Sequence, residues 1–184
     1  MTIKMLVPFK LSSDVECYAT PLGLFVERPT LALIDNGKMR AKDLLTKIGD
    51  ILKAREKIAS YFVHTKTGVA PMESDEVERV RNTADLVVVG VGDCGGCSSC
   101  AVLDAVEFLN QGTLALVIAS KPFEYVVNVT ARERNASGLE YGLVDHPVYT
   151  RDDDWIAAAA GRLADIVMHS IDEHTRPPAS IGAA

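Results

Sequence analysis

The sequence has no long hydrophobic run and no run of basic residues. Its 19 Lys and Arg residues are outnumbered by 25 Asp and Glu residues, which gives a formal charge of −6. An acidic chain without a basic patch is a poor partner for nucleic acid or for an anionic membrane. Its apolar stretches are also too short to cross a bilayer. We therefore expect no nucleic-acid partner and no membrane association.

Cysteine is scarce, with four residues in 184, but three of the four, Cys94, Cys97 and Cys100, lie close together. Met1–Lys4 is not followed by the apolar stretch of a secretory signal, so we expect a cytoplasmic protein with reduced thiols. In a reducing compartment, clustered cysteines favour catalysis or metal binding over structural disulfides. The cluster is therefore the first place to search for chemistry.

Hydrophobic residues make up 48% of the chain, which is sufficient for one domain with a substantial core. We predict an N-terminal arm at residues 1–29, an α/β domain at 30–173 that carries the thiols, and a tail at 174–184. The tail is expected to be disordered. We interpret the arm as lying over the domain or over a second subunit, so we expect a homo-oligomer.

Apolar runs alternate with segments of helical periodicity along the predicted domain. The run Leu86–Val89 is typical of a parallel strand that is buried on both faces. Four further strands are predicted at 30–35, 58–64, 113–120 and 141–145. Helices are predicted at 44–55, 73–82, 101–109, 122–134 and from 152 onward.

This alternation predicts a flavodoxin-like, doubly wound, parallel five-stranded sheet of order 2-1-3-4-5, with helices on both faces. In such folds ligands bind at the carboxyl ends of the strands, near the switch point between the first and third strands. The loops that begin at Asn36, Asp93, Ser120 and His146 are all expected at that edge.

Cys94 and Cys97 are separated by two glycines, which is the spacing of a redox dithiol. They lie where a strand leads into a helix, and a thiol at a helix amino terminus has a lowered pKa. Either cysteine could be the nucleophile, and we choose Cys94, the more exposed along the turn, with Cys97 resolving. In the helix that follows, we expect Asp104 and Glu107 on the polar face.

A metal site is the alternative for the same cluster. Thiolates from Cys94, Cys97 and Cys100 could hold zinc or an iron–sulfur cluster, with Cys17 or His146 as the fourth ligand. Otherwise Cys100 and Cys17 are interpreted as buried packing residues.

Residues of the neighbouring loops complete the predicted site. His146 could act as the general acid or base, although an ordinary turn histidine is the alternative. Lys38 could supply positive charge, but we expect a solvated lysine. Lys121 is placed at the same edge. The predicted substrate-binding residues are Asn36, Gly37, Asp93, Gly95, Ser98 and Glu124.

Two of these residues have simpler explanations. Asp93 is as compatible with an Asx turn as with capping the thiol loop or raising the pKa of a neighbouring thiol. Asn36 precedes Gly37, and an Asn-Gly turn requires no function.

The segment Gly90–Ser99 resembles the signature of the UGSC family of (seleno)proteins. In that family a reactive selenocysteine or cysteine is followed by Gly-Ser-Cys. Here Cys94 takes the reactive position, Gly96 replaces the serine, and Cys97 is the second cysteine. The similarity extends over residues 30–148 and includes Leu33–Lys38, Asp104–Glu107 and His146–Pro147.

The resemblance implies redox chemistry, in which a nucleophilic thiolate is oxidised and then reduced by another thiol. We therefore predict an enzyme that acts on a small electrophilic substrate, with a thiol reductant as co-substrate and no bound cofactor. Cys100 is a departure from the motif and keeps the zinc or iron–sulfur alternative open. The remaining alternatives are a non-redox lyase, hydratase or racemase that uses a cysteine, and a redox sensor.

Overall fold

The structure, a computed structural model, describes residues 24, 26–68 and 70–175. Cys17, most of the predicted arm and all but two residues of the predicted tail lie outside the described residues. Leu24 forms an isolated parallel bridge with Thr175, so the two ends of the described fold meet. No helix in the described part is long and apolar enough to cross a membrane.

Five parallel strands form one sheet of order β2-β1-β3-β4-β5, which confirms the predicted flavodoxin-like fold. The strands are β1 (Thr30–Asp35), β2 (Ser60–Thr65), β3 (Leu86–Gly92), β4 (Leu114–Ser120) and β5 (Glu140–Val144). The helices are α1 (Ala41–Ala54), α2 (Ser74–Arg81), α3 (Gly95–Asn110), α4 (Glu124–Glu133) and α5 (Asp153–His174), with a short 3-10 helix η1 (Lys121–Phe123) before α4. Each predicted strand and helix is present, and the differences are confined to their ends.

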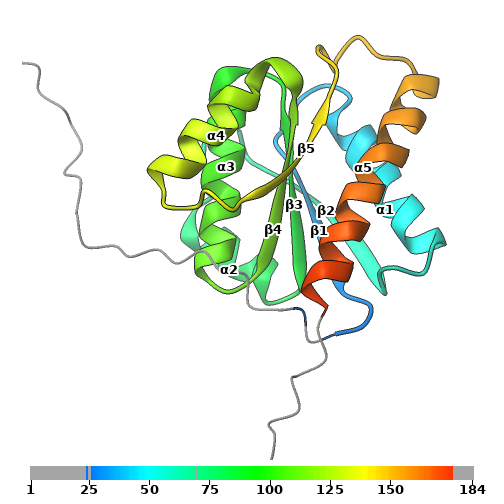
Figure 1. The fold of residues 1–184 in the computed structure, drawn as a ribbon, viewed down its shortest axis with the longest axis vertical. Coiled ribbons are helices and arrows are strands. Elements are labelled where there is room, and N and C mark those ends of the chain that lie inside the picture. Colours follow the sequence, from blue (N-terminus) through cyan, green and yellow to red (C-terminus); the bar gives the residue numbers. More distant parts are fainter. Residues whose placement is uncertain (1–23, 25, 69, 176–184) are drawn as a thin grey trace, which may run out of the picture.

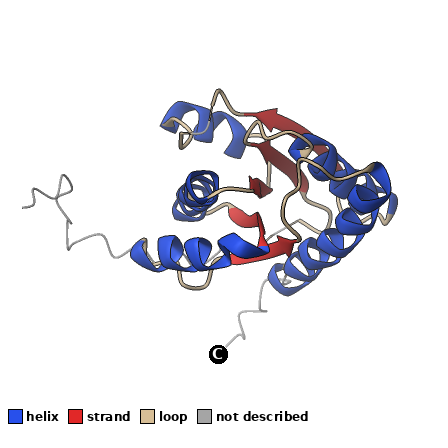
Figure 2. Ribbon diagram, turned by 90° about the horizontal axis from the view of Figure 1, so that it is seen from above, coloured by secondary structure: helices blue, strands red, loops and turns tan. Residues whose placement is uncertain are grey.

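The helices cover both faces of the sheet, as predicted. Helices α1 and α5 lie on one side of the sheet, and α2, α3 and α4 lie on the other (Figure 1). The view from above shows the strands between these two layers (Figure 2). The sheet therefore has a hydrophobic core on each of its two faces, and its central strands must be apolar on both faces.

The side chains of β3 alternate between those cores. Leu86 and Val88 pack in the core beneath α1 and α5, whereas Val87 and Val89 pack beneath α2, α3 and α4. All four side chains are fully buried. A strand with apolar neighbours on both faces has no position for a polar residue, which explains the uninterrupted Leu and Val run.

All five strands run in the same direction, so the loops after β1, β3, β4 and β5 open at one edge of the sheet. The loop after β1 carries Lys38, the loop after β3 carries Cys94, and the loop after β5 carries His146. The fold thus brings to one edge the residues that the sequence places far apart.

Candidate functional site

The thiol loop is very short, because β3 ends at Gly92 and α3 begins at Gly95. Cys94 is the N-cap residue of α3, and its Sγ accepts a hydrogen bond from the backbone N–H of Cys97 at 3.3 Å. The first N–H groups of a helix have no partner within the helix, and they favour an anion at this end. The sulfur of Cys94 therefore lies where a negative charge is stabilised.

Gly92 allows β3 and α3 to approach closely. A Cβ at this position would lie 2.6 Å from Oγ and 2.9 Å from Cα of Ser98. Ser98 is fully buried, and its Oγ donates to the carbonyl oxygen of Cys94 at 2.8 Å. Ser98, predicted to bind substrate, thus holds the first turn of α3 to the loop and has no exposed surface for a ligand.

The three cysteines of the cluster are free thiols, and they differ in exposure. Cys97 is buried with 3% of its surface exposed, whereas Cys94 is half-buried. Burial by itself would raise the pKa of Cys94, but hydrogen bonds from the Cys97 side chain and backbone and the charge of Lys38 outweigh it and lower that pKa. Cys94 is thus the thiol that ionises more readily.

Cys97 and Cys100 are shifted in the opposite direction. Burial raises the pKa of Cys97, and its hydrogen bond to Cys94 raises it further, while Lys38 opposes both effects. Burial also raises the pKa of Cys100, against the attraction of Lys66. The two thiols of the CxxC pair therefore have unequal tendencies to ionise, and Cys100 is kept protonated.

Lys38 corrects one expectation from the sequence. It was expected to be a solvated lysine, but its ammonium interacts with the sulfurs of both Cys97 and Cys94. The hydrogen bond with Cys97 and the negative charge of the two thiolates raise the pKa of Lys38. The loop after β1 thus supplies a cation to the thiol pair.

The Asn36 side chain hydrogen-bonds to the backbone of Val91 at a β-bulge in strand β3. The register between β3 and β4 shifts at Gly90 and Gly92, so Val91 lacks a partner in the ladder. The Asn36 side chain donates to the carbonyl oxygen of Val91 at 2.8 Å and accepts from its N–H at 3.1 Å. Because a buried peptide group requires hydrogen-bond partners, Asn36 stabilises this bulge immediately before the thiol loop. Its predicted contact with substrate stays a prediction.

Asp93 and His146 meet on the other side of the thiol loop. Oδ1 of Asp93 lies 2.9 Å from Nδ1 of His146 and accepts from Oγ of Ser120 at 2.6 Å. Oδ2 accepts from the N–H of Val148 at 3.1 Å. The Asp93 side chain is only 5% exposed, so its carboxylate joins the loops after β3, β4 and β5 instead of facing a ligand.

The other predicted binding residues lie at the same edge with fewer contacts. Gly37 adopts a φ of 74°, a conformation that favours glycine, and its N–H donates to Oδ1 of Asp35 at 2.9 Å. A side chain at Gly95 would meet open space. Glu124 accepts from the hydroxyl of Tyr141 at 3.1 Å, and Lys121 pairs with Asp145 at 2.6 Å, both on the exposed surface.

A model of the UGSC family matches residues 5–173 of the 184-residue chain. The chain belongs to the UGSC family. The match confirms the resemblance drawn from Gly90–Ser99 and extends beyond residues 30–148 in both directions. It includes much of the predicted arm, which the resemblance did not cover. Among curated proteins, none matches the chain.

Asp104 of this UGSC chain corrects a second expectation. It was placed on the polar face of α3, but its side chain is 1% exposed and forms an ion pair with Lys66, which is 2% exposed. Its Oδ1 also accepts from the N–H of Met72 at 2.7 Å. Burial raises the pKa of Asp104, and the hydrogen bond from Lys66 opposes this shift. The pair fixes the segment after β2 against α3, close to Cys100.

Lys66 was not identified from the sequence as a residue of interest. Two features of the sequence could have drawn attention to this pair. Lys66 directly follows a predicted strand, and Asp104 lies in a helix that is rich in apolar residues. Neither feature indicates which partner the other has, because residues 66 and 104 are far apart in the sequence.

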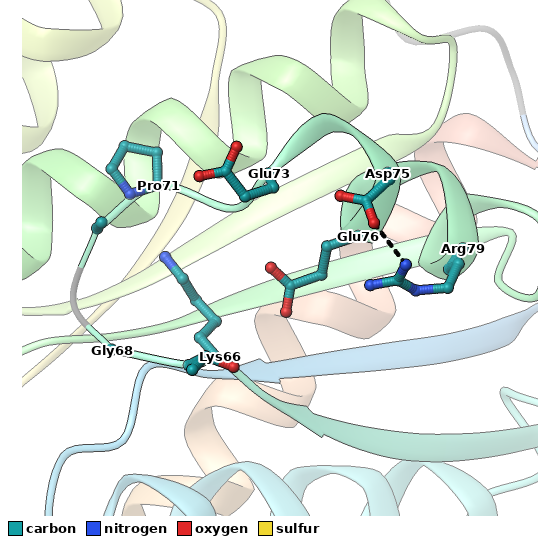
Figure 3. A pocket seen from close by; sticks show the side chains of 9 residues that line it. Lys66, Gly68, Pro71, Glu73, Asp75, Glu76 and Arg79 are labelled. Atoms are coloured by element: carbon teal, nitrogen blue, oxygen red, sulfur yellow. Dashed lines mark hydrogen bonds and ion pairs between the residues drawn. The ribbon is translucent and has the colours of Figure 1, made fainter.

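A hollow of about 310 Å³ lies beside α2, and its lining residues are Lys66, Thr67, Gly68, Ala70, Pro71, Glu73, Asp75, Glu76 and Arg79. Figure 3 shows Lys66, Glu73 and Glu76 around it, with Asp75 paired to Arg79. None of its lining residues is a cysteine, and none belongs to the loops after β1, β3 or β5. The hollow is therefore separate from the thiol site.

The arrangement of the metal-ligating side chains is relevant to the alternative of a zinc or iron–sulfur site. In residues 24, 26–68 and 70–175, no three His, Cys, Asp or Glu side chains are grouped so that they could hold a metal ion. The described residues thus do not assemble the three-thiolate site from Cys94, Cys97 and Cys100 that zinc or an iron–sulfur cluster would require.

Proposed function

We propose that this protein is a thiol-dependent redox enzyme in which Cys94 attacks a small electrophilic substrate and Cys97 resolves the intermediate. The observation that carries the proposal is the asymmetry of the pair at the start of α3. Cys94 is the more exposed thiol and has the lowered pKa, whereas Cys97 is buried beside it with a raised pKa. A dithiol with one ready nucleophile and one protonated partner suits attack followed by resolution.

The reaction proposed is the reductive removal of a leaving group. The thiolate of Cys94 forms a bond to the electrophilic carbon of R–X, and X⁻ departs. Cys97 gives its proton to His146, attacks the sulfur of Cys94 and forms the disulfide. The R⁻ group released in that step takes a proton from His146 and leaves as R–H.

A small thiol then completes the cycle. Two equivalents of the thiol reduce the Cys94–Cys97 disulfide and are themselves joined as a disulfide, so electrons balance over one turnover. Lys38 stabilises the thiolates, and no bound cofactor takes part in the sequence of steps. We propose that the enzyme works in the cytoplasm as a homo-oligomer, where reduced thiols are abundant.

A test uses 2-bromoacetophenone as the electrophile and dithiothreitol as the reductant. Wild-type protein is expected to release acetophenone and bromide, with two thiols oxidised for each ketone formed. Cys94→Ser should abolish turnover while the far-UV spectrum is unchanged. Cys97→Ser should stop after the first step, so that intact mass shows a phenacyl group on Cys94.

Cys100→Ser is the matched control, because it removes a neighbouring thiol of α3 that has no role in these steps. It should retain turnover close to that of the wild type. Turnover by Cys94→Ser would overturn the assignment. Turnover without consumption of reductant would favour the non-redox lyase, hydratase or racemase. Metal that is bound by the wild-type protein and lost in each of Cys94→Ser, Cys97→Ser and Cys100→Ser would favour the zinc or iron–sulfur alternative.

A further inference from the structure

His146 differs from two other histidines of the fold in the nitrogen that meets a carboxylate. Nδ1 of His146 lies 2.9 Å from Oδ1 of Asp93. In His64 and His174 the nitrogen that meets a carboxylate is Nε2, at 2.5 Å from Glu76 and 2.8 Å from Glu140. An ionised carboxylate can only accept hydrogen bonds, so the facing nitrogen must carry the proton.

The surroundings of Asp93 fix its role as an acceptor. Its carboxylate receives the hydroxyl of Ser120 at 2.6 Å and the N–H of Val148 at 3.1 Å, in addition to His146. Ser120 is fully buried and Asp93 is 5% exposed, so water does not compete easily for these bonds. Three donors converge on one buried carboxylate, so both of its oxygens act as acceptors.

The ring of His146 is also held in orientation. Phe123 packs against it edge to face, with the ring centroids 5.4 Å apart and the planes at 80°. Arg151 donates to the carbonyl oxygens of His146 and Pro147, both at 3.0 Å. Within the described residues, no hydrogen bond engages Nε2 of His146, whose side chain is 36% exposed.

We infer that Asp93 and Ser120 are positioning residues that hold His146 in the tautomer with its proton on Nδ1, so that Nε2 is the atom that accepts and donates protons at the thiol edge. The catalytic use of Nε2 rests on the proposed function. The tautomer itself does not, because Asp93 imposes it before any substrate binds. In serine-protease triads an Asp-to-Asn change preserves the geometry but produces the wrong histidine tautomer.

The test is ¹⁵N NMR of histidine-labelled full-length protein, recorded at a pH where the imidazoles are neutral. His146 should show a protonated Nδ1 and an unprotonated Nε2, whereas His64 and His174 should show the reverse pattern in the same spectrum. An Nε2-protonated His146 in the wild type would overturn the inference. This readout requires no turnover, so it stands apart from any failure of the proposed function.

The variant Asp93→Asn provides a second test of the inference. The amide has one acceptor where the carboxylate offers two, so His146 should shift toward the Nε2-protonated tautomer while His64 keeps its own pattern. If the thiol reaction also holds, kcat should fall by about 10² or more with little change in KM. An unchanged His146 tautomer in a folded Asp93→Asn protein would contradict the role of Asp93.

Discussion

Cys94 and Cys97 are the same chemical group three residues apart, and the fold gives them different protonation behaviour. Cys94 caps α3 and receives hydrogen bonds, whereas Cys97 donates to it from a buried position. Lys38, from a different loop, acts on the pKa values of both thiols. At the scale of single residues, the hydrogen bonds from Cys97 and, after them, the charge of Lys38 lower the pKa of Cys94 against the effect of burial.

Lys38→Met tests that statement directly. Removal of the ammonium should raise the pKa of Cys94, because the thiolate loses an opposite charge and a hydrogen bond. Since only the thiolate is alkylated, iodoacetamide should react with Cys94 several-fold more slowly at pH 7. The midpoint of the rate against pH should move to higher pH, as read from fragment masses that locate the label.

Lys38→Arg is the matched control, because it keeps the charge and the donor groups. Its alkylation profile should stay close to that of the wild type. In both proteins Cys94 should react at lower pH than Cys97 and Cys100, whose pKa values are raised. A Lys38→Met profile that coincides with the wild-type profile would show that Lys38 does not act on Cys94.

At the scale of elements, the site depends on how closely β3 and α3 are joined. Gly92 lies against Ser98 with no room for a Cβ, whereas Gly95 in the first turn of α3 faces open space. The bulge at Val91, held by Asn36, directly precedes this junction. The direction in which α3 leaves the sheet, and hence the direction of Cys94, follows from these contacts.

Gly92→Ala should therefore disturb both stability and chemistry. The added methyl group must displace Ser98 and the start of α3, which is expected to lower the free energy of unfolding by about 1–3 kcal/mol. Cys94 should also be alkylated more slowly, because its N-cap geometry is lost. Urea denaturation and the alkylation rate measure the two effects.

Gly95→Ala provides the comparison on the other side of the same β3–α3 junction. Its methyl group meets no atom within 4 Å. Because alanine also restricts the unfolded chain, we expect unchanged stability or a gain of about 0.4–1 kcal/mol. Equal losses of stability in Gly92→Ala and Gly95→Ala would show that close approach at Gly92 is not the cause.

At the scale of the whole molecule, the described residues form two hydrophobic cores, one on each face of the sheet. The two buried clusters draw their residues from Leu24 to Ile171. Leu24 is 5% exposed, and its N–H donates to the carbonyl oxygen of His174 at 3.0 Å, which joins the two ends of the domain. Residues 5–23 belong to the family match and lie outside the described residues.

Deletion of residues 1–23 should therefore leave a cooperative unfolding transition with a similar midpoint. If the arm covers a second subunit and not its own domain, the full chain should be a homo-oligomer and the truncated chain a smaller species. Circular dichroism melts and native mass spectra of both proteins measure these outcomes. A monomeric full-length protein would overturn the proposed oligomer, and loss of cooperative unfolding would show that the arm is part of the core.

The sequence by itself determined the fold class and the junction that carries the thiols. Apolar runs and helical periodicity are local patterns, so they predicted the elements of the sheet and the position of Cys94 and Cys97 where β3 meets α3. The helix predicted from residue 152 is likewise present as α5, and the Asp152 side chain at its start accepts from the N–H of Trp155 at 2.8 Å. These features depend on residues close together in the chain.

Only the tertiary structure decided which polar residues meet. Lys38 reaches the thiols from another loop, Asp104 pairs with Lys66, and Asp93 holds His146 across 53 positions of sequence. Helical periodicity placed Asp104 on a polar face, because it cannot show that the segment after β2 covers that face. Such contacts depend on the lengths of loops and on strand register, and these bring distant residues together without leaving a local pattern.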